Sequence, residues 1–106
     1  MITLEDFSKV QLKVARVLEA GAHPNAEKLL VLQIDTGGEK KQIVAGIAHH
    51  YTSAELVGKR IVVVDNLQPA TLRGVISQAM LLAAQEGESL CLVVPEKPVS
   101  AGAAVR

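Results

Sequence analysis

The feature that most constrains the fold is a pair of short apolar segments joined by a turn that contains two glycines. Apolar and polar side chains alternate across residues 29–35, and residues 41–45 form the second segment. Alternation with a period of two is typical of a strand with one buried face. Glycines in the connection, residues 36–39, are free to adopt the positive φ that hairpin turns need. We therefore expect a β-hairpin, and a chain built mainly from strands.

The other elements follow from similar local patterns. Residues 12–18 begin as alternation and end in adjacent apolar side chains, which predicts a long strand with a bulge or strong bend. Residues 60–64 and 90–94 are further strands, and residues 77–84 are strand-like although rich in Ala. Capping boxes at residues 3–6 and 52–55 predict short helices, and Gly58 supplies a stop for the second. Residues 21–26 and 66–69 are expected to be loops, and Pro95 and Pro98 limit strand pairing after residue 94.

The order of these elements indicates the fold class. Three strands, a short helix and two or three more strands match an all-β OB-fold, a five-stranded Greek-key barrel, with short helices and a C-terminal strand extension. A β-sandwich is the alternative, but it usually needs more strands than this chain supplies. With 106 residues the chain is expected to form a single domain over residues 1–106.

The core must be aliphatic. Hydrophobic residues make up 49% of the chain, yet Phe7 and Tyr51 are its only aromatic residues. So many Val, Leu, Ile and Ala residues on a short chain predict apolar surface left over for a partner interface.

The cellular setting is suggested by cysteine usage and hydropathy. Cys91 is the only cysteine, so no internal disulfide can form, which fits a reducing cytoplasm. Within the apolar run 90–94 it is interpreted as a small buried hydrophobic residue. We expect no secretory signal, because no basic region precedes an apolar stretch at the N-terminus, and no membrane partner, because no apolar run reaches about 18 residues.

Catalysis and metal binding have little support. The three histidines, His23, His49 and His50, lack further ligands at metal-binding spacing, and we interpret the adjacent pair as part of a polar loop. No nucleophile elbow or phosphate-binding loop is present. We therefore expect a protein that is not an enzyme by itself and that holds no cofactor and no metal.

The sequence supports nucleic-acid binding better than catalysis, although the formal net charge is zero. Basic residues recur on the expected strands and turns, and Arg73 lies between strands where its guanidinium could reach phosphate groups. Proteins that bind single strands stack bases on aromatic side chains, and two aromatic residues cannot form such a platform. Folded RNA, recognised by its backbone shape, is the expected ligand.

Long stretches of the chain resemble the tRNA-binding domain appended to methionyl-tRNA synthetases, and also free-standing bacterial tRNA-binding proteins. The similar stretches are residues 6–17, 23–29, 42–47, 51–59, 66–70 and 72–84. The resemblance implies an OB barrel with an added C-terminal portion, and a homodimer to whose interface that portion contributes. It also implies shape-specific binding of tRNA near its elbow, in support of aminoacylation, with the catalytic part of a methionyl-tRNA synthetase as a possible partner.

Carried over to matching positions, the resemblance implies an RNA-binding set. Its expected members are Asn66, Arg73, Ser77 and Met80, with Lys28 and Lys41 as electrostatic support. The segment His23-Pro24 is expected to shape a loop rather than to contact RNA.

The sequence departs from the family pattern at several positions. Ala15 and Ala79 stand where glycine is usual, and a methyl group at Ala79 could weaken or shift an RNA contact. Two alternatives stay open. Ala79, the zero net charge and the surplus of aliphatic residues favour a module that chiefly dimerises a synthetase, and the opening pattern Asp6-Phe7-x-Lys9 is shared with secretion-associated chaperone relatives of the same fold.

Overall fold

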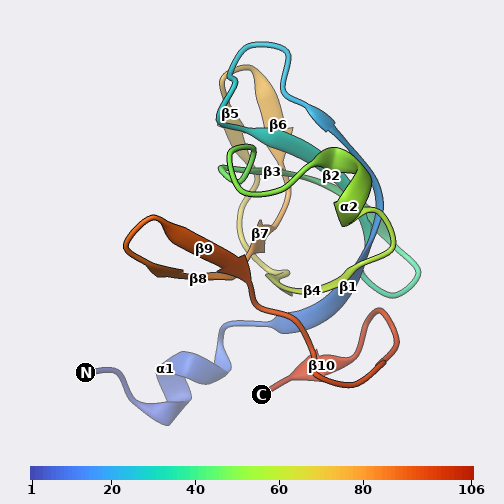
Figure 1. Cartoon of the computed structure of the whole chain (residues 1–106). Coiled ribbons are helices and arrows are strands. Elements are labelled where there is room, and N and C mark those ends of the chain that lie inside the picture. Colours follow the sequence, from blue (N-terminus) through green and yellow to red (C-terminus); the bar gives the residue numbers. More distant parts are fainter.

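The structure is a computed structural model that describes residues 1–106, and it confirms the predicted all-β barrel of the OB type. Its main sheet has the strand order β3-β2-β1-β4-β7, and β10 pairs with β1 beside this path (Figure 1). Two further antiparallel pairs, β5 with β6 and β8 with β9, stand outside the main sheet. The elements are α1 Leu4–Ser8, β1 Leu12–Ala22, β2 Leu30–Asp35, β3 Lys40–Ala45, α2 Ser53–Leu56, β4 Arg60–Val64, β5 Ala70–Leu72, β6 Val75–Ser77, β7 Met80–Leu81, β8 Ala83–Glu86, β9 Ser89–Leu92 and β10 Ala104–Val105.

The long first strand organises the barrel. β1 pairs with β2 on one side and β4 on the other, and its register with β2 shifts between Val17 and Glu19. This irregularity is the predicted bulge, and it lets one strand belong to both sides of a curved sheet. The strand continues to Ala22, so the prediction that residues 21 and 22 are loop is wrong: both pair with β2.

The predicted hairpin and helices form where local patterns placed them. In the β2–β3 turn Gly37 and Gly38 have φ values of 101° and 98°. Thr3 and Thr52 each close a capping box at the start of α1 and α2. Their partners lie only three residues away, which is why the sequence alone revealed them.

The barrel closes through the segment between β6 and β7. The Gln78 N–H donates to the Gln42 carbonyl of β3 at 2.7 Å, and β7 pairs with β4 through Val63 and Val64. Residues 77–84 thus change partners along their length. The prediction of one strand here is wrong, because the stretch divides into the end of β6, β7 and the start of β8.

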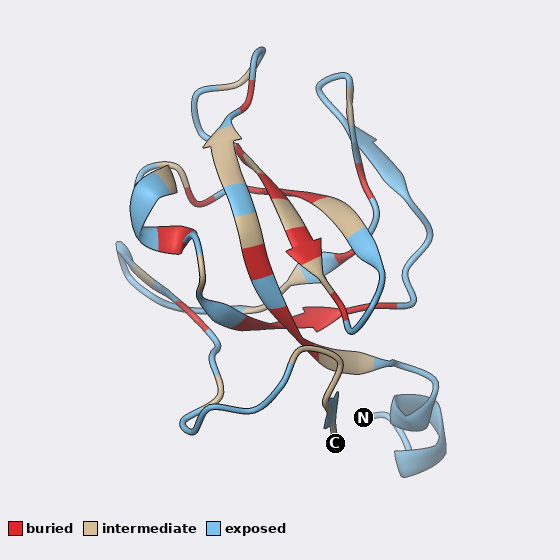
Figure 2. Cartoon of the chain, turned by 90° about the vertical axis from the view of Figure 1, so that its right-hand side faces the viewer, coloured by how far each residue is buried: buried red, intermediate tan, exposed pale blue.

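The buried side chains fill the barrel. They include Leu32, Ile34, Ile43, Leu56, Ile61 and Val63, none of which retains accessible surface. Figure 2 shows buried positions along the strands of the barrel and on α2, whereas α1 is exposed throughout and stands away from the barrel. The core is aliphatic as predicted: Tyr51 packs against it from the edge, and its hydroxyl oxygen accepts the Leu92 N–H at 3.0 Å.

The C-terminal portion is the predicted extension. β8 and β9 form a hairpin that leaves the barrel, and β10 returns to pair with Leu12 and Lys13. The last strand before Pro95 ends at Leu92, not at residue 94. Cys91 is exposed, so the prediction that it is buried is wrong. Alternation explains this, since its neighbour Leu92 takes the inward position.

Candidate nucleic-acid interface

A two-residue turn carries Arg73 at the tip of the β5–β6 hairpin. Leu72 pairs with Val75, so Arg73 and Gly74 form the whole connection, and their φ values are 54° and 90°. Two successive positive φ angles define a type I′ turn, which favours Asn or Gly at the first position. Arg73 is the only residue other than glycine in this conformation, at a cost of about 1 kcal/mol. Backbone strain of this kind tends to occur where a side chain has a function.

The loop before β2 holds this hairpin in place. His23 is buried, with 5% of its surface exposed. Its Nδ1 accepts the Asn25 N–H at 2.9 Å, so the proton is on Nε2, which donates to the Leu72 carbonyl at 2.9 Å. The Asn25 amide donates to the Arg73 carbonyl at 3.2 Å. These contacts give His23 the predicted shaping role and fix the backbone that presents Arg73.

Two cationic side chains face the same hollow beside this turn. The hollow has a volume of about 410 Å³ and is lined by Arg73 and by Ala26, Glu27, Lys28 and Leu29. Neither Lys28 nor Arg73 has a carboxylate within ion-pair distance, because all three ion pairs of the chain involve Lys13 or Lys41. The hollow therefore offers two unpaired positive charges to an anion, with Glu27 as the one opposing charge.

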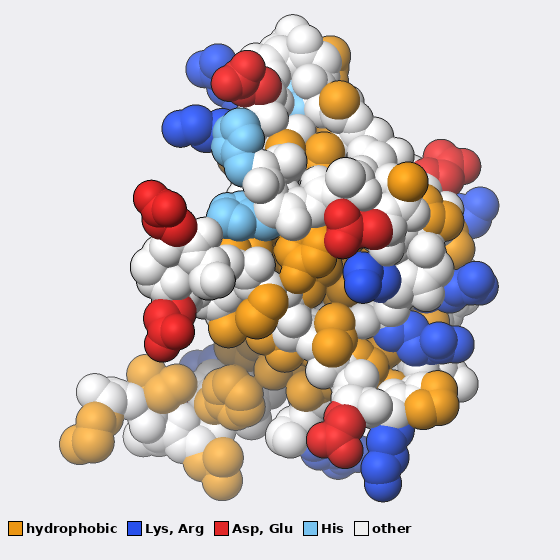
Figure 3. Space-filling view, in the orientation of Figure 1, with side chains coloured by type: hydrophobic (Ala, Val, Ile, Leu, Met, Phe, Trp, Pro, Cys, Tyr) orange, Lys and Arg blue, Asp and Glu red, His pale blue; other side chains and the backbone are white.

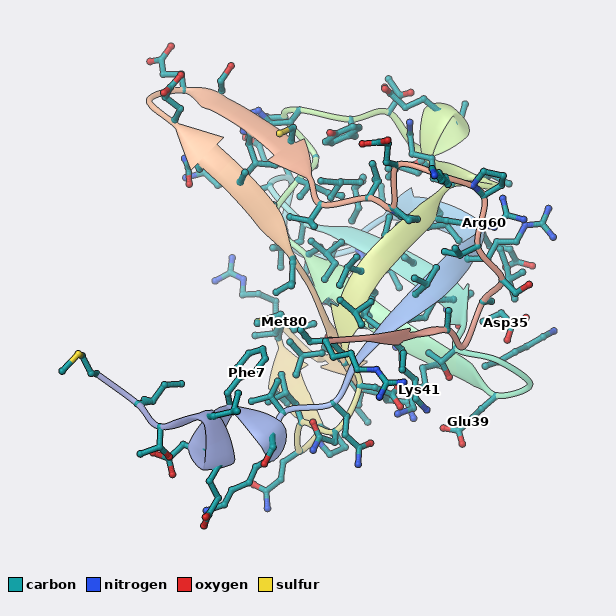
Figure 4. All side chains as sticks on the ribbon, turned by 90° about the horizontal axis from the view of Figure 1, so that it is seen from below. Phe7, Asp35, Glu39, Lys41, Arg60 and Met80 are labelled. Carbon is teal, nitrogen blue, oxygen red and sulfur yellow. The ribbon has the colours of Figure 1, made fainter.

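A smaller apolar groove lies at the base of the same hairpin. Its volume is about 160 Å³, and Leu67, Leu72 and Met80 line it while remaining 39–49% exposed. Figure 4 shows Met80 on the side of the barrel nearer α1. Ala79 also lines the groove but is only 5% exposed and belongs to the core cluster. Its methyl group is therefore packed into the protein rather than raised toward a ligand.

Three of the predicted site residues are engaged in bonds within the protein. The Ser77 hydroxyl is buried, accepts the Val44 N–H and donates to the Ala79 carbonyl, each at 3.0 Å. The Asn66 side chain donates to the Lys9 carbonyl at 2.7 Å and accepts the Gln11 N–H at 2.9 Å. The hydrogen bonds of Ser77 and Asn66 therefore hold neighbouring segments of the chain together beside the groove.

Lys41 is the third. Its ammonium lies 2.8 Å from Asp65 Oδ1, and the Lys13 ammonium lies 2.9 Å from Asp65 Oδ2 (Figure 4 shows Lys41 between Met80 and Glu39). Burial of Asp65 would by itself raise the pKa of the carboxyl, but the hydrogen bonds from Lys41 and Lys13 hold it below its ordinary value. This ionised carboxylate offsets both lysines. RNA contact by Lys41, as by Ser77 and Asn66, stays a prediction.

The structure also identifies residues that the sequence did not single out. Three such residues lie around the hairpin: Asn25, Leu67 and Gln68. They belong to the candidate interface only because the fold brings residues 23–29 against residues 66–74. The predicted loop at residues 66–69 is confirmed, but no strand was predicted in the segment after it, where β5 and β6 pair from Ala70 on. The strands are three residues long and exposed, so they leave no alternation to detect.

No group of three or more His, Cys, Asp or Glu side chains could hold a metal ion. None of the helices is long and apolar enough to cross a membrane.

The barrel and the presented hairpin define the class of protein: a small all-β binding module. Comparison with known families then gives the assignment. A family model described as "Putative tRNA binding domain" matches residues 12–104, and the chain belongs to this tRNA-binding domain family, a non-catalytic binding module.

Methionine–tRNA ligases are among the relatives of this chain. The chain is 59% identical to that of Thermotoga maritima over 104 residues, which is 98% of this chain and 16% of the relative. It is 47% identical to that of Pyrococcus furiosus over 105 residues, 99% of this chain and 14% of the relative. The chain thus spans 14–16% of the length of these relatives.

Solved structures agree with the fold. A protein related to methionyl-tRNA synthetase from Pyrococcus horikoshii superimposes with a TM-score of 0.93 at 36% identity, covering 100% of this chain and 98% of that one. The chaperone CsaA of Bacillus anthracis gives 0.90 at 29% identity, covering 100% and 99%. The same barrel therefore occurs in proteins described as synthetase-related and as chaperones.

Proposed function

We propose that this chain binds folded tRNA through the β5–β6 hairpin and the loop before β2, and thereby supports aminoacylation by a methionyl-tRNA synthetase. The observation that carries the proposal is the strained Arg73 turn, which is held by His23 and Asn25 and shares a hollow with the unpaired Lys28. Guanidinium and ammonium groups are the usual phosphate ligands of RNA-binding proteins. Leu67 and Met80 extend this surface with apolar contact area.

The placement of the aromatic residues supports folded RNA over single strands. Tyr51 bonds to β9 at the edge of the core and Phe7 lies on α1, so neither lines the hollow or the groove. Without a stacking platform, contact with a preformed backbone is the mode this surface can offer. Within a cytoplasmic synthetase the module would raise the local concentration of tRNA at the catalytic part.

Titration of labelled tRNA with the chain at 50 and 200 mM salt tests the proposal. We expect preference for tRNA over single-stranded RNA and duplex DNA of equal length. We also expect the affinity to fall with salt, by a slope of about 2–3 if two or three phosphates are neutralised. Equal affinity for all three ligands at low salt would contradict the proposal and favour a module that chiefly dimerises a synthetase.

We further propose that two copies associate through α1 and the surface beside it. The helix has no buried residue, and Ile2, Leu4 and Phe7 are 70%, 84% and 40% exposed. Figure 3 shows this apolar group projecting at the lower left. An arm that is anchored to the barrel through Asn66 and leaves these apolar side chains exposed supports an interface between copies.

The double variant Leu4→Ser with Phe7→Ser should convert a dimer into a folded monomer. Both side chains are exposed in the protomer, so their removal leaves the barrel core intact while it removes apolar area from the interface. Sedimentation equilibrium would report the mass, and circular dichroism the fold. If the wild-type chain sediments as a monomer both at high protein concentration and after 100-fold dilution, the proposed dimer is contradicted.

A further inference from the structure

A row of charged side chains crosses the sheet at the end of β2 that lies away from the Arg73 hairpin. Lys40 of β3 pairs with Asp35 of β2, Asp35 with Arg16 of β1, and Arg16 with Arg60 of β4. Partners in register point to the same face of a sheet, so these four side chains form one line across four strands. Figure 4 shows Arg60 and Asp35 on the same side of the barrel, with Arg60 directed outward.

The pairing of Arg16 with Arg60 is unfavourable for the fold. Like charges directly opposite one another destabilise a sheet, and neither guanidinium has a carboxylate within 4.0 Å. Asp35, the one acidic residue of the row, has its Oδ1 occupied by the Gly37 and Gly38 N–H groups at 2.8 and 2.9 Å. Asp35 lies opposite both Arg16 and Lys40, whereas Arg60 lies opposite Arg16 alone. A guanidinium that faces a like charge and has no acidic partner is expected at functional positions.

More cations border the end of this row. Lys59, Arg60 and Lys97 line a hollow of about 330 Å³ between the start of β4 and the segment after β9, and Glu96 is its only acidic residue. Lys59 is fixed by its backbone, since its carbonyl accepts the Val17 N–H at 2.9 Å. Figure 3 shows Lys and Arg side chains gathered along the right-hand edge, where β1 and the β2–β3 turn lie in Figure 1.

This surface is separate from the hairpin surface. Lys28 precedes β2, whereas Asp35 ends it, and six strand residues span roughly 17–20 Å. We propose that Arg16, Lys59, Arg60 and Lys97 form a second RNA contact, which binds phosphates of the tRNA held at Arg73 without reading its sequence. The inference rests on the proposed function and adds to it: the domain contacts tRNA at two places, so a small chain with zero net charge can gather enough phosphates to bind.

The double variant Arg16→Gln with Arg60→Gln tests the second contact in the full chain. Full-length tRNA should bind about five- to tenfold more weakly, and the slope of log affinity against log salt should fall by about 1–2, because up to two phosphate contacts are lost. A short RNA hairpin, too small to reach both surfaces, should bind the variant and the wild type equally. The urea midpoint should stay the same or rise, because the like-charge pair is gone. A residue with a purely structural role would lower it.

Arg106→Gln is the matched control, since it removes one exposed guanidinium from the chain end beyond β10. It should leave the affinity for tRNA within about twofold of wild type. Unchanged tRNA affinity and salt slope in the double variant would overturn the second contact and leave an acidic protein as the candidate partner. If the wild type binds tRNA and the Arg73 variants bind it more weakly while the double variant does not, that result overturns this inference alone. A wild-type chain that does not bind tRNA overturns the proposed function as well.

Discussion

Replacement of Arg73 with Asn is expected to weaken tRNA binding by about tenfold while the free energy of unfolding stays constant or rises. A charge-assisted hydrogen bond to phosphate contributes about 1.5–3 kcal/mol, and a loss of 1.4 kcal/mol is tenfold in affinity. Asn followed by Gly74 is the preferred sequence of a type I′ turn, so the substitution relieves the strain at φ 54°. The expected gain in stability is about 0.5–1 kcal/mol. Titration with tRNA and urea unfolding would measure the two effects.

Two companion variants separate charge from geometry. Arg73→Lys keeps the positive charge but not the planar pair of donors, so an intermediate affinity is expected. Arg73→Ala removes the charge and keeps the strain, so it should bind as weakly as the Asn variant without its gain in stability. Wild-type affinity in Arg73→Asn would show that this side chain does not contact RNA. A clear loss of stability would show that its bond to the Asn25 carbonyl, at 3.5 Å, matters more than the strain.

Replacement of Asp65 with Asn is expected to lower the free energy of unfolding by about 2–3 kcal/mol. The carboxylate is 9% exposed and touches Lys13 and Lys41, which is itself 16% exposed. Breaking a fully buried ion pair costs about 3–5 kcal/mol, and the 35% exposure of Lys13 reduces that figure. For a domain of this size the melting temperature should fall by about 10 °C. Thermal and urea unfolding would check this expectation.

The same carboxylate predicts how stability depends on pH. Because the folded pKa of Asp65 lies below its ordinary value, the ion pairs contribute fully above the unfolded pKa of about 3.9. Their contribution is lost as the pH falls through the folded pKa. The Asn variant should therefore lose less stability than the wild type between pH 5 and 2. Glu88→Gln, in the exposed β8–β9 turn, is the control and should change stability by less than about 0.5 kcal/mol. An equal pH dependence in wild type and variant would contradict the assignment.

Elements whose signals lie within a few residues were predictable from the sequence. The β2–β3 hairpin follows from alternation and two glycines, and both short helices follow from a threonine and an acidic residue three positions on. The bulge in β1 was visible as a break in alternation. The prediction of a single strand at residues 77–84 failed because an apolar run indicates burial but does not indicate where the chain changes its pairing partner.

The candidate site was predictable only in part. Arg73 and Lys28 were both predicted to contact RNA, and the fold brings them to one hollow, while the contact itself stays a prediction. The hairpin that presents Arg73 was missed, because two exposed strands of three residues have no periodicity. The roles of His23 and Asn25 depend on contacts with residues 48–49 positions away, which no local pattern encodes.

The main barrel strands, the helix caps and the aliphatic core follow from the sequence, because period, capping and turn chemistry act over a few residues. The bonding partners of the polar side chains come from the tertiary structure alone. Lys41 meets Asp65 from 24 positions away, Ser77 meets Val44 from 33, and Asn66 meets Lys9 from 57. Closure of the barrel creates these neighbours, and a polar group that is removed from water must bond to whatever the fold places beside it.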